Sequence, residues 1–342
     1  MKRASPPSGR PGRPVRVADV AEAAGVSVAT VSRTLNNKGR VDPELAARVR
    51  DAATRLGYRI NGVARNLRRQ DTQVWALIIP DINNPFYTAV ARGVEDAAQE
   101  AGYSVLLGNT DEDEAKEQQY LEVAVQERVA GLILSPRSTT TDLSWFGGSG
   151  IPIVVVDREL DRPFDFVTAS SYDGAVAATE HLLAQGWRRP ACITRPSYAA
   201  TAEQRRLGYL EVVRRHGLPE LVGVVPFHDS GLDVITELMA GDHPPDSLLT
   251  VDSMLALGMI SALKQLRKPI AAEVGLISFD DSAWAPVIEP PLSVIVQPAY
   301  EIGVAAAQLL IGRIRGEAPD GPQRRILDTT LIVRKSSGRS GR

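Results

Sequence analysis

From residue 74 onward, short apolar runs alternate with longer amphipathic segments, and this alternation restricts the possible folds more than any other feature. The apolar runs span residues 75–81, 103–110, 130–136, 151–158, 165–170, 191–195, 223–227, 247–252, 275–280 and 292–298. Helical periodicity lies between most of them, at residues 85–101, 112–127, 172–185, 201–216, 231–240, 253–266 and 299–315. The alternation predicts an α/β fold with parallel sheets covered on both faces. Around 260 residues is large for one such sheet, so we expect two.

Polar and charged residues follow most of the predicted strands, at residues 81–84, 109–111, 135, 157–158, 170–171, 195, 252–253 and 280–281. In parallel α/β sheets, ligands bind beyond the carboxyl ends of the strands. Any one of these residues alone is explained as the residue that closes a strand. Their recurrence in both halves of the body predicts a cleft for a small polar ligand between two lobes.

A short basic segment precedes this body. Residues 1–70 contain 15 Lys and Arg against 5 Asp and Glu, whereas the other 272 residues contain 24 against 36. A small basic head on an acidic body indicates that the head meets a polyanion. Residues 1–14 are rich in proline, glycine and arginine, and we expect a disordered basic arm there. An arm that reaches into a DNA minor groove is the alternative.

The segment VADVAEAAGVSVATVSRTLN, residues 17–36, has the pattern of two short helices joined by a tight turn. Gly25 is placed to end the first helix, and Ser27 is placed to cap a second one that runs from Val28 to Leu35. A third helix is predicted between the cap signals Asp42 and Gly57. Three such helices form a helix-turn-helix, whose second helix enters the DNA major groove. A three-helix module that packs without DNA is the alternative, and the basic charge of the head argues against it.

This segment resembles the DNA-binding head of the lactose-repressor/galactose-repressor (LacI/GalR) family of transcriptional regulators, and the likeness extends through Tyr58. The resemblance implies that Val28 and Ala29 occupy the exposed positions that vary with operator sequence. Arg33 has the geometry to fork onto a guanine. The DNA-binding residues expected in the head are Arg16, Val17, Ser27, Val28, Ala29, Thr30, Ser32, Arg33, Asn36 and Arg40.

The decapeptide NGVARNLRRQ, residues 61–70, has helical spacing but is too short to be stable as an isolated helix in water. It resembles the family's hinge helix, which folds when two copies meet on DNA. The resemblance implies that Leu67 wedges between base pairs in the minor groove. Ile60 stands where the family often has proline, which weakens the stop signal before the helix. The DNA contacts expected here are Asn61, Ala64, Arg65, Leu67 and Arg68, and a plain charged linker is the alternative.

The body resembles the periplasmic-sugar-binding-like core of the same family, on the motifs NNPFY, RLGYL, MLALG, FDDSAWAPVIEPPLS and QPAYEIG. The resemblance covers nearly the whole chain and implies that it crosses between two lobes three times, near residues 170–171, 297–298 and 330. The expected domains are a helix-turn-helix at 15–59, a hinge at 60–71, an effector-binding and dimerisation core at 72–337 and a tail at 338–342. Within the core we expect an N-lobe of about 73–170 and 299–329 and a C-lobe of about 171–297 and 330–337.

The resemblance also implies a set of effector-binding residues. Arg205 matches the family's effector-binding arginine, and Asp280 matches an aspartate that hydrogen-bonds ligand hydroxyls. Asp252 stands where the family usually has asparagine. Such charged planar groups suit the adjacent hydroxyls of a sugar. The whole expected set is Asn84, Phe86, Asn109, Ser135, Arg158, Ser171, Arg205, Phe227, Asp252, Trp284, Asp280 and Gln297, in which the three aromatic side chains could face a sugar ring or a base.

Two departures from the family pattern concern carboxylates. Ser170-Ser171 stand where the family often has Asp-Asn, and Ser253 stands where it has Asp, so groups that commonly grip a sugar are lost. The effector is therefore expected to be smaller, more anionic or held differently. Arg158 and Arg195 near the rim would tolerate a carboxylate or phosphate on the ligand, although we favour a surface salt bridge as the use of each.

The sequence lacks the common signatures of enzymes and metal sites. No GxxxxGK[ST] or GxSxG motif occurs, and the four histidines have no metal-ligand spacing. Cys192 lies in an apolar run and is expected to be a buried, inert thiol. The chain is thus predicted to have no enzymatic activity, no cofactor and no metal site. A missing secretory signal and the lack of a membrane-length apolar run predict a cytoplasmic, nucleoid-associated protein.

We therefore expect a homodimeric, sequence-specific DNA-binding regulator, in this family most often a repressor. A small polar effector, a sugar or related metabolite, is expected to control its affinity for a palindromic operator. The direction of this control is open. A solute-binding receptor without DNA function is the alternative, which the basic head and the missing signal peptide disfavour. An enzyme of the nucleoside-hydrolysing or sugar-phosphate type ranks third.

Overall fold

The computed structural model describes residues 15–35, 41–58 and 72–339 of the 342-residue chain. The chain divides into two compact units, Met1–Asp71 and Thr72–Arg342. We refer to the described part of the first unit as the head and to the second as the body. Among the described residues, no helix is long and apolar enough to cross a membrane.

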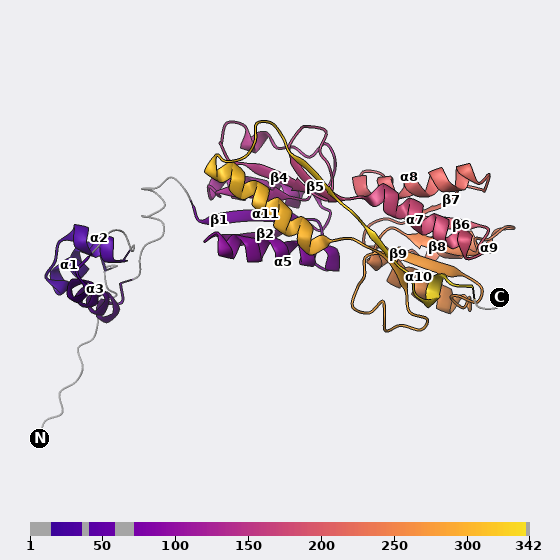
Figure 1. Ribbon diagram of the computed structural model, residues 1–342, viewed down its shortest axis with the longest axis horizontal. Helices are drawn as coiled ribbons and strands as arrows, with labels where there is room; N and C mark the ends of the chain where they lie inside the picture. Colours follow the sequence, from indigo (N-terminus) through magenta and orange to yellow (C-terminus); the bar gives the residue numbers. More distant parts are fainter. Residues whose placement is uncertain (1–14, 36–40, 59–71, 340–342) are drawn as a thin grey trace, which may run out of the picture. The chain divides into compact units, whose positions relative to one another are not determined.

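The head consists of α1 (Val17–Ala24), α2 (Val28–Leu35) and α3 (Pro43–Leu56) (Figure 1). Gly25 ends α1 with a φ of 63°, in the left-handed region that glycine adopts without strain. The Ser27 hydroxyl oxygen accepts a hydrogen bond from the backbone N–H of Thr30 (3.1 Å), as expected of a residue that caps α2. The predicted helices and their cap residues are confirmed.

One fully buried valine from each helix forms the centre of the head: Val20, Val31 and Val49. Leu35, at the end of α2, packs against this cluster. The guanidinium of Arg48 donates a hydrogen bond to the Ala24 carbonyl (2.6 Å), which ties α3 to the end of α1. The head therefore has its own core and holds α2 with one face turned outward.

The body contains two six-stranded sheets, and we call the part around each sheet the N-lobe and the C-lobe (Figure 1). The N-lobe sheet, in the order β11-β5-β4-β3-β1-β2, is made of β1 (Val74–Ile79), β2 (Ser104–Asn109), β3 (Gly131–Leu134), β4 (Ile153–Val156), β5 (Asp165–Ala169) and β11 (Arg324–Leu327). The C-lobe sheet, in the order β12-β10-β9-β8-β6-β7, is made of β6 (Pro190–Thr194), β7 (Leu221–Val224), β8 (Ser247–Thr250), β9 (Gly275–Phe279), β10 (Ser293–Val296) and β12 (Thr330–Ile332). All neighbouring strands are parallel except β10 and β12, which confirms the predicted fold class.

Helices cover both faces of these sheets. They are α5 (Pro85–Glu100), α6 (Glu114–Gln126), α7 (Ser171–Ala184), α8 (Ala200–Arg215), α9 (Leu232–Ala240), α10 (Ser253–Gln265) and α11 (Ala299–Arg315), with short 3-10 helices η1 (Ser144–Phe146) and η2 (Lys335–Ser337). In β1, Trp75 and Leu77 pack into the core beneath α5 and α11, whereas Ala76 and Ile78 pack into the core on the side of α6. Alternate side chains point to opposite faces of a strand. This burial on both faces explains why β1 is an uninterrupted apolar run.

The chain passes between the lobes three times, after β5, after β10 and after β11. As a result α11 packs along α5, although almost 200 residues of chain lie between them (Figure 1). The last two strands lie at sheet edges: β11 at an edge of the N-lobe sheet and β12 at an edge of the C-lobe sheet. The apolar pattern did not predict either of them, because they are short and largely exposed: Ile326 in β11 is 55% exposed.

Two glycines set the distance between α5 and α11. A Cβ atom on Gly93 would lie 2.2 Å from the carbonyl oxygen of Tyr300, and a Cβ atom on Gly303 would lie 2.2 Å from that of Val90. The two helices therefore pack backbone against backbone at a reciprocal pair of glycines. Since α11 buries Ile302 and Leu310 in the N-lobe core, this close approach completes the lobe.

Candidate functional site

The outer face of α2 carries several of the DNA-binding residues predicted in the head. Ser27, Val28, Ala29 and Arg33 are exposed there, and Thr30 and Ser32 are half-buried. At the start of α1, Arg16 is exposed and Val17 is half-buried. Val28 itself is 47% exposed, although it is apolar. The face therefore presents small and apolar side chains beside one guanidinium, groups that suit thymine methyl groups and guanine edges in a major groove.

The other predicted DNA contacts lie outside the described residues. They are Asn36, Arg40, Asn61, Ala64, Arg65, Leu67 and Arg68. The predicted basic arm at 1–14 and the whole predicted hinge at 60–71 also lie outside the described residues. Their roles stay predictions.

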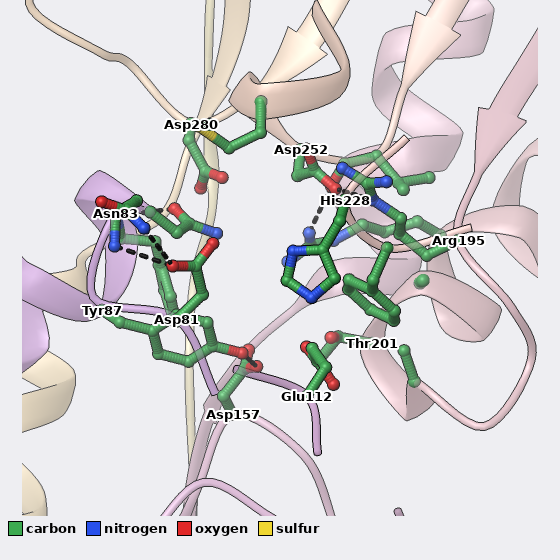
Figure 2. Close-up of a pocket in the computed structure, with 18 of the residues that line it drawn as sticks. Asp81, Asn83, Tyr87, Glu112, Asp157, Arg195, Thr201, His228, Asp252 and Asp280 are labelled. Atoms are coloured by element: carbon green, nitrogen blue, oxygen red, sulfur yellow. Dashed lines mark hydrogen bonds and ion pairs between the residues drawn. The ribbon is translucent and has the colours of Figure 1, made fainter. Parts of the chain in front are cut away.

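A cavity of about 450 Å³ lies between the two lobes of the body, beyond the carboxyl ends of strands from both sheets. Figure 2 shows its polar side chains converging from the two sides. The volume lies within the range of about 300–1,000 Å³ that is typical of small-molecule sites. Its polar lining includes Asp81, Asn83, Asn84, Glu112, Asp157, Arg158, Arg195, Arg205, His228, Asp252, Asp280 and Gln297.

On the N-lobe side, a buried ion pair forms part of the cavity wall. Arg158 donates through Nη1 and Nη2 to the two carboxylate oxygens of Glu112, at 3.0 and 2.6 Å. Both side chains are about 5% exposed or less, so this is a bidentate pair held out of water. Beside it, the hydroxyl of Tyr87 donates to the carboxylate of Asp157 (2.8 Å). Burial raises the pKa of Asp157 and raises that of Tyr87 well above its usual value.

On the C-lobe side, Arg205 organises a second buried network. Its guanidinium donates to the Ser171 hydroxyl (3.2 Å), the Val251 carbonyl (2.5 Å) and the side-chain oxygen of Gln297 (2.8 Å). Gln297 in turn donates through its amide nitrogen to the carboxylate of Asp280 (2.6 Å). The chain Arg205–Gln297–Asp280 therefore fixes the orientation of an amide and a carboxylate at the cavity edge.

A second arginine of the C-lobe is also held by a carboxylate. Arg195 donates through Nε to Asp252 (2.9 Å) and through Nη1 to the carbonyl of Pro226 (2.8 Å). The other oxygen of Asp252 accepts from the backbone N–H of Leu255 (2.7 Å) and so caps α10. The Arg195 guanidinium also lies 5.1 Å from the ring centroid of Phe227. Arg195 therefore fixes the loop after β7 against the start of α10.

Four non-glycine residues that line the cavity have a backbone conformation that such residues rarely adopt. The φ angles of Glu112, Asp157, His228 and Asp280 are 57°, 64°, 67° and 71°. Asp157 directly follows β4, and Asp280 directly follows β9. A left-handed residue at a strand end turns the chain sharply and costs on the order of 1 kcal/mol. Such conformations concentrate at ligand sites, and here they direct two carboxylates toward the cavity.

The two lobes also touch each other across the cavity. The imidazole Nε2 of His228 lies 3.2 Å from the carbonyl oxygen of Asp111, a contact between the loops after β7 and β2. The guanidinium of Arg137 in the N-lobe lies 4.6 Å from the ring centroid of Tyr198 in the C-lobe. Each contact is small, in the range of about 0.5–1 kcal/mol for exposed sites. Together they join the lobes at the cavity edge and leave its interior open.

Comparison with known proteins decides the family. Residues 16–61 match the model of the bacterial regulatory proteins, lacI family, and residues 179–337 match a periplasmic binding protein-like domain. The ribose operon repressor of Halalkalibacterium halodurans is 36% identical over 324 residues, which covers 94% of this chain and 96% of that protein. The chain belongs to the lacI family of bacterial regulatory proteins. It is a DNA-binding transcriptional regulator.

Solved structures agree with this membership. The transcriptional regulator CelR in complex with cellobiose is 28% identical, with a TM-score of 0.70 over 95% of this chain and all of that one. The Lac repressor dimer bound to operator and the anti-inducer ONPF has a TM-score of 0.85 over 95% of this chain at 23% identity, a likeness of fold. For this lacI-family regulator the receptor-type alternative without DNA function has no support.

The structure brings eight of the twelve predicted effector-binding residues of the regulator to the cavity: Asn84, Phe86, Arg158, Arg205, Phe227, Asp252, Asp280 and Gln297. Trp284 was expected to offer a ring to the ligand, but it packs against the C-lobe core and is not among the lining residues. Ser135 is fully buried at the end of β3, so it also lies outside the lining.

Two further predicted residues do not line the cavity but hydrogen-bond to the segments that do. Asn109 accepts a hydrogen bond from the backbone N–H of Ile82 (2.8 Å) and so holds the loop after β1. Ser171 lies beneath Arg205 and accepts its hydrogen bonds. The expectation that Arg158 and Arg195 form surface salt bridges is wrong in one respect. Both form ion pairs, but their side chains are only 5% and 9% exposed, because the strand ends that carry them face the other lobe.

Several lining residues of the regulator were not among the predicted effector-binding set. Tyr87 and Glu112 are the most important of them, because both belong to the buried network around Arg158. Glu112 lies one residue beyond 109–111, the polar positions predicted after β2. Tyr87 lies in the first turn of α5, where helical periodicity assigns an aromatic residue to the core. His228, in the loop after β7, had no sequence signal at all.

Burial of Asp280 gives the regulator a pH-dependent stability. Desolvation raises the pKa of Asp280 to about 6, although Arg205 lowers it in part. A carboxyl group whose pKa is higher in the folded than in the unfolded state destabilises the fold as the pH rises through about 4–6. At pH 7 the cost is about 2–3 kcal/mol by the usual conversion of a pKa difference.

Replacing Asp280 with asparagine is therefore expected to raise the free energy of unfolding by about 1–2 kcal/mol at pH 7.5. The gain should shrink to a few tenths of a kcal/mol near pH 4, where the wild-type carboxyl group is protonated in the folded state and about half protonated in the unfolded state. Urea unfolding at the two pH values measures it. Asp281→Asn is the control, because Asp281 forms an ion pair with Arg334 at 2.7 Å and should show no such gain. An equal gain from Asp280→Asn at both pH values would contradict the burial argument.

Proposed function

We propose that the protein binds palindromic operator DNA as a homodimer and that a small polar ligand in the cavity controls its affinity. The observation that carries this proposal is the cavity itself, lined from both lobes by fixed amide, carboxylate and guanidinium groups in a chain that also has a helix-turn-helix head. We propose repression as the outcome of operator binding. Its place of action is then the cytoplasm, at the nucleoid.

The proposed DNA contacts divide into two groups. Ser27, Val28, Ala29 and Arg33 on α2 would read base edges in the major groove, with Thr30, Ser32, Arg16 and Val17 at the margins. Asn36, Arg40 and the hinge residues Asn61, Ala64, Arg65, Leu67 and Arg68 would bind the backbone and the minor groove. An isologous dimer would present two copies of this surface to two half-sites.

We propose a sugar or related metabolite as the ligand class. The support is the name of one relative, a ribose operon repressor, and the cellobiose bound by another. Arg205, Asp280 and Gln297 offer donors and acceptors in fixed positions, which matches the adjacent hydroxyl groups of a sugar. Ligand binding would favour one arrangement of the lobes, and the heads of the dimer would follow that change.

The test is an operator-binding assay. The full-length protein is titrated into a labelled palindromic duplex from the upstream region of its own gene, and fluorescence polarisation is read at about 150 mM salt. We expect binding at least about 1,000-fold tighter than to a random duplex, the lower end for specific DNA binding. Pentoses and hexoses are then added to find which one shifts the affinity and in which direction. Equal affinity for both duplexes would overturn the proposal.

Replacing Arg33 with alanine is expected to weaken operator binding by about 1–3 kcal/mol, the usual value of one bidentate contact to a base. Arg33→Lys keeps the charge but loses the planar fork. It should therefore retain affinity for random DNA while still losing affinity for the operator. The two affinities are compared by the same polarisation assay. If Arg33→Ala weakened binding to both duplexes equally, Arg33 would be a phosphate contact and not a base contact.

A further inference from the structure

Carboxylates outnumber guanidinium groups around the cavity. Six carboxyl groups line it, those of Asp81, Glu112, Asp157, Asp229, Asp252 and Asp280, against the guanidinium groups of three arginines. In a partly desolvated site, charges are screened much less than in water. The cavity is therefore an environment with excess negative charge, which bears on the kind of ligand it accepts.

The positive groups are already engaged by the protein. Arg158 lies between two carboxylates. Glu112 accepts hydrogen bonds from both terminal nitrogens of Arg158, and the Nε of Arg158 is 3.8 Å from the carboxylate of Asp157. Arg195 is paired with Asp252 at 2.9 Å. Arg205 donates to a hydroxyl, a carbonyl and an amide oxygen. An anionic group that took over one of the ion-paired nitrogens of Arg158 or Arg195 would displace a carboxylate and leave it buried and unpaired, which costs several kcal/mol.

Hydrogen-bond acceptors, in contrast, remain available. Asp280 accepts from Gln297 through one carboxylate oxygen, and among the described residues nothing donates to its other oxygen. Asp81 likewise uses one oxygen to accept from the backbone and side chain of Asn83. Figure 2 shows the carboxylates of Asp81 and Asp280, one from each lobe, reaching toward the same open space. Free acceptors that converge in this way suit a ligand rich in hydroxyl groups.

We infer that the cavity selects a monosaccharide-sized polyhydroxyl ligand without an anionic group, and that the Glu112–Arg158 pair is the main determinant that rejects aldonates and sugar phosphates. The inference deepens the proposed function and rests on the cavity being its ligand site. The sequence left open an effector that is smaller, more anionic or held differently, and the inference excludes the more anionic one.

Calorimetry with matched ligands tests the inference on the full-length protein. The probes are D-ribose, D-ribonate and D-ribose 5-phosphate, and D-glucose, D-gluconate and D-glucose 6-phosphate. The wild-type protein is expected to bind the neutral member of at least one set 100-fold or more tightly than both of its anionic forms. An anionic form that binds as tightly as its neutral partner would overturn the inference. The inference would also be overturned if neither neutral sugar bound while specific operator binding was intact. That result would leave the DNA-binding part of the proposed function unaffected.

The variant Glu112→Gln tests the assigned determinant. It keeps the shape of the side chain but frees the charge of Arg158, so the preference for the neutral ligand should fall at least tenfold. Glu203→Gln is the matched control, because Glu203 forms a similar two-bond pair with Arg206 (2.6 and 2.8 Å) in α8 and does not line the cavity. The control should keep the wild-type preference. A folded Glu112→Gln protein with an unchanged preference for the neutral ligand would rule out the Glu112–Arg158 pair as the determinant. If this variant does not fold, the comparison of neutral and anionic ligands on the wild-type protein still decides the ligand class.

Discussion

Replacing Arg205 with alanine is expected to abolish the control of DNA binding by the cavity ligand. Arg205 is 5% exposed and holds together Ser171, Val251 and the Gln297–Asp280 pair. Without it the amide of Gln297 loses its anchor, and Asp280 loses the positive charge that lowers its pKa. Hydrogen bonds to charged groups contribute about 1.5–3 kcal/mol each. We therefore expect the ligand affinity to fall at least about 100-fold, or roughly 2.7 kcal/mol.

The measurement is calorimetric titration of Arg205→Ala with a ligand found to bind the wild-type protein, together with operator binding in its presence. Operator affinity without ligand should stay within about threefold, since the head has its own core. Arg206→Ala, at the next position, is the matched control, because it removes only a half-exposed pair with Glu203, usually worth about 0–1 kcal/mol. Unchanged ligand affinity in a folded Arg205→Ala protein would show that the ligand binds elsewhere.

Replacing Gly93 with alanine is expected to destabilise the body strongly for a change of one methyl group. The new Cβ atom would lie 2.2 Å from the Tyr300 carbonyl and 3.0 Å from the Val304 backbone nitrogen. Neither contact is with a flexible side chain, so α5 and α11 must move apart along their whole length. Overpacking of a core costs typically about 1–3 kcal/mol. We expect the upper end of that range or more, measured by chemical denaturation.

The control for this change lies in α11 itself. A Cβ atom on Gly312 would lie 3.5 Å from its nearest neighbour, the side chain of Ala318, which is an ordinary contact. Gly312→Ala should therefore stabilise the protein by about 0.4–1 kcal/mol, since alanine loses less backbone entropy in a helix. If Gly93→Ala were as mild as Gly312→Ala, the two helices would have room to adjust, and the tight pairing of α5 and α11 would be wrong.

Most of the fold could be predicted from the sequence, because its strongest signals are local. The helices of the head are marked by capping residues such as Ser27 and by the left-handed Gly25, and these act within a few residues. The apolar strands are marked by burial on both faces, as in β1. The exceptions are β11 and β12, whose pairing depends on chain passages from distant positions. Their exposed side chains carry no apolar pattern.

The candidate site was less predictable, because a cavity depends on which side chains meet. Asp280 and Asp252 follow apolar runs in the sequence, and both line the cavity as their positions at strand ends predict. Trp284 lies in the loop after β9, where nothing in the sequence indicates whether an aromatic side chain turns to the core or to the ligand. The pairing of Arg158 with Glu112 joins positions 46 residues apart. No spacing rule reveals such a pair before the lobes are assembled.

The passages of the chain between the lobes also determine the order in which the protein can be completed during synthesis. The first five N-lobe strands have all been made by Ala169, yet α11, which covers Trp75 and Leu77, ends only at Arg315. At about 5–20 residues per second, a ribosome needs roughly 7–30 s to make the chain between these points. During that interval the apolar face that α5 and α11 share is covered by α5 alone, while the whole C-lobe except its last strand is synthesised. The lobe that begins first is therefore among the last parts to become stable, and a truncated N-lobe would be prone to aggregate.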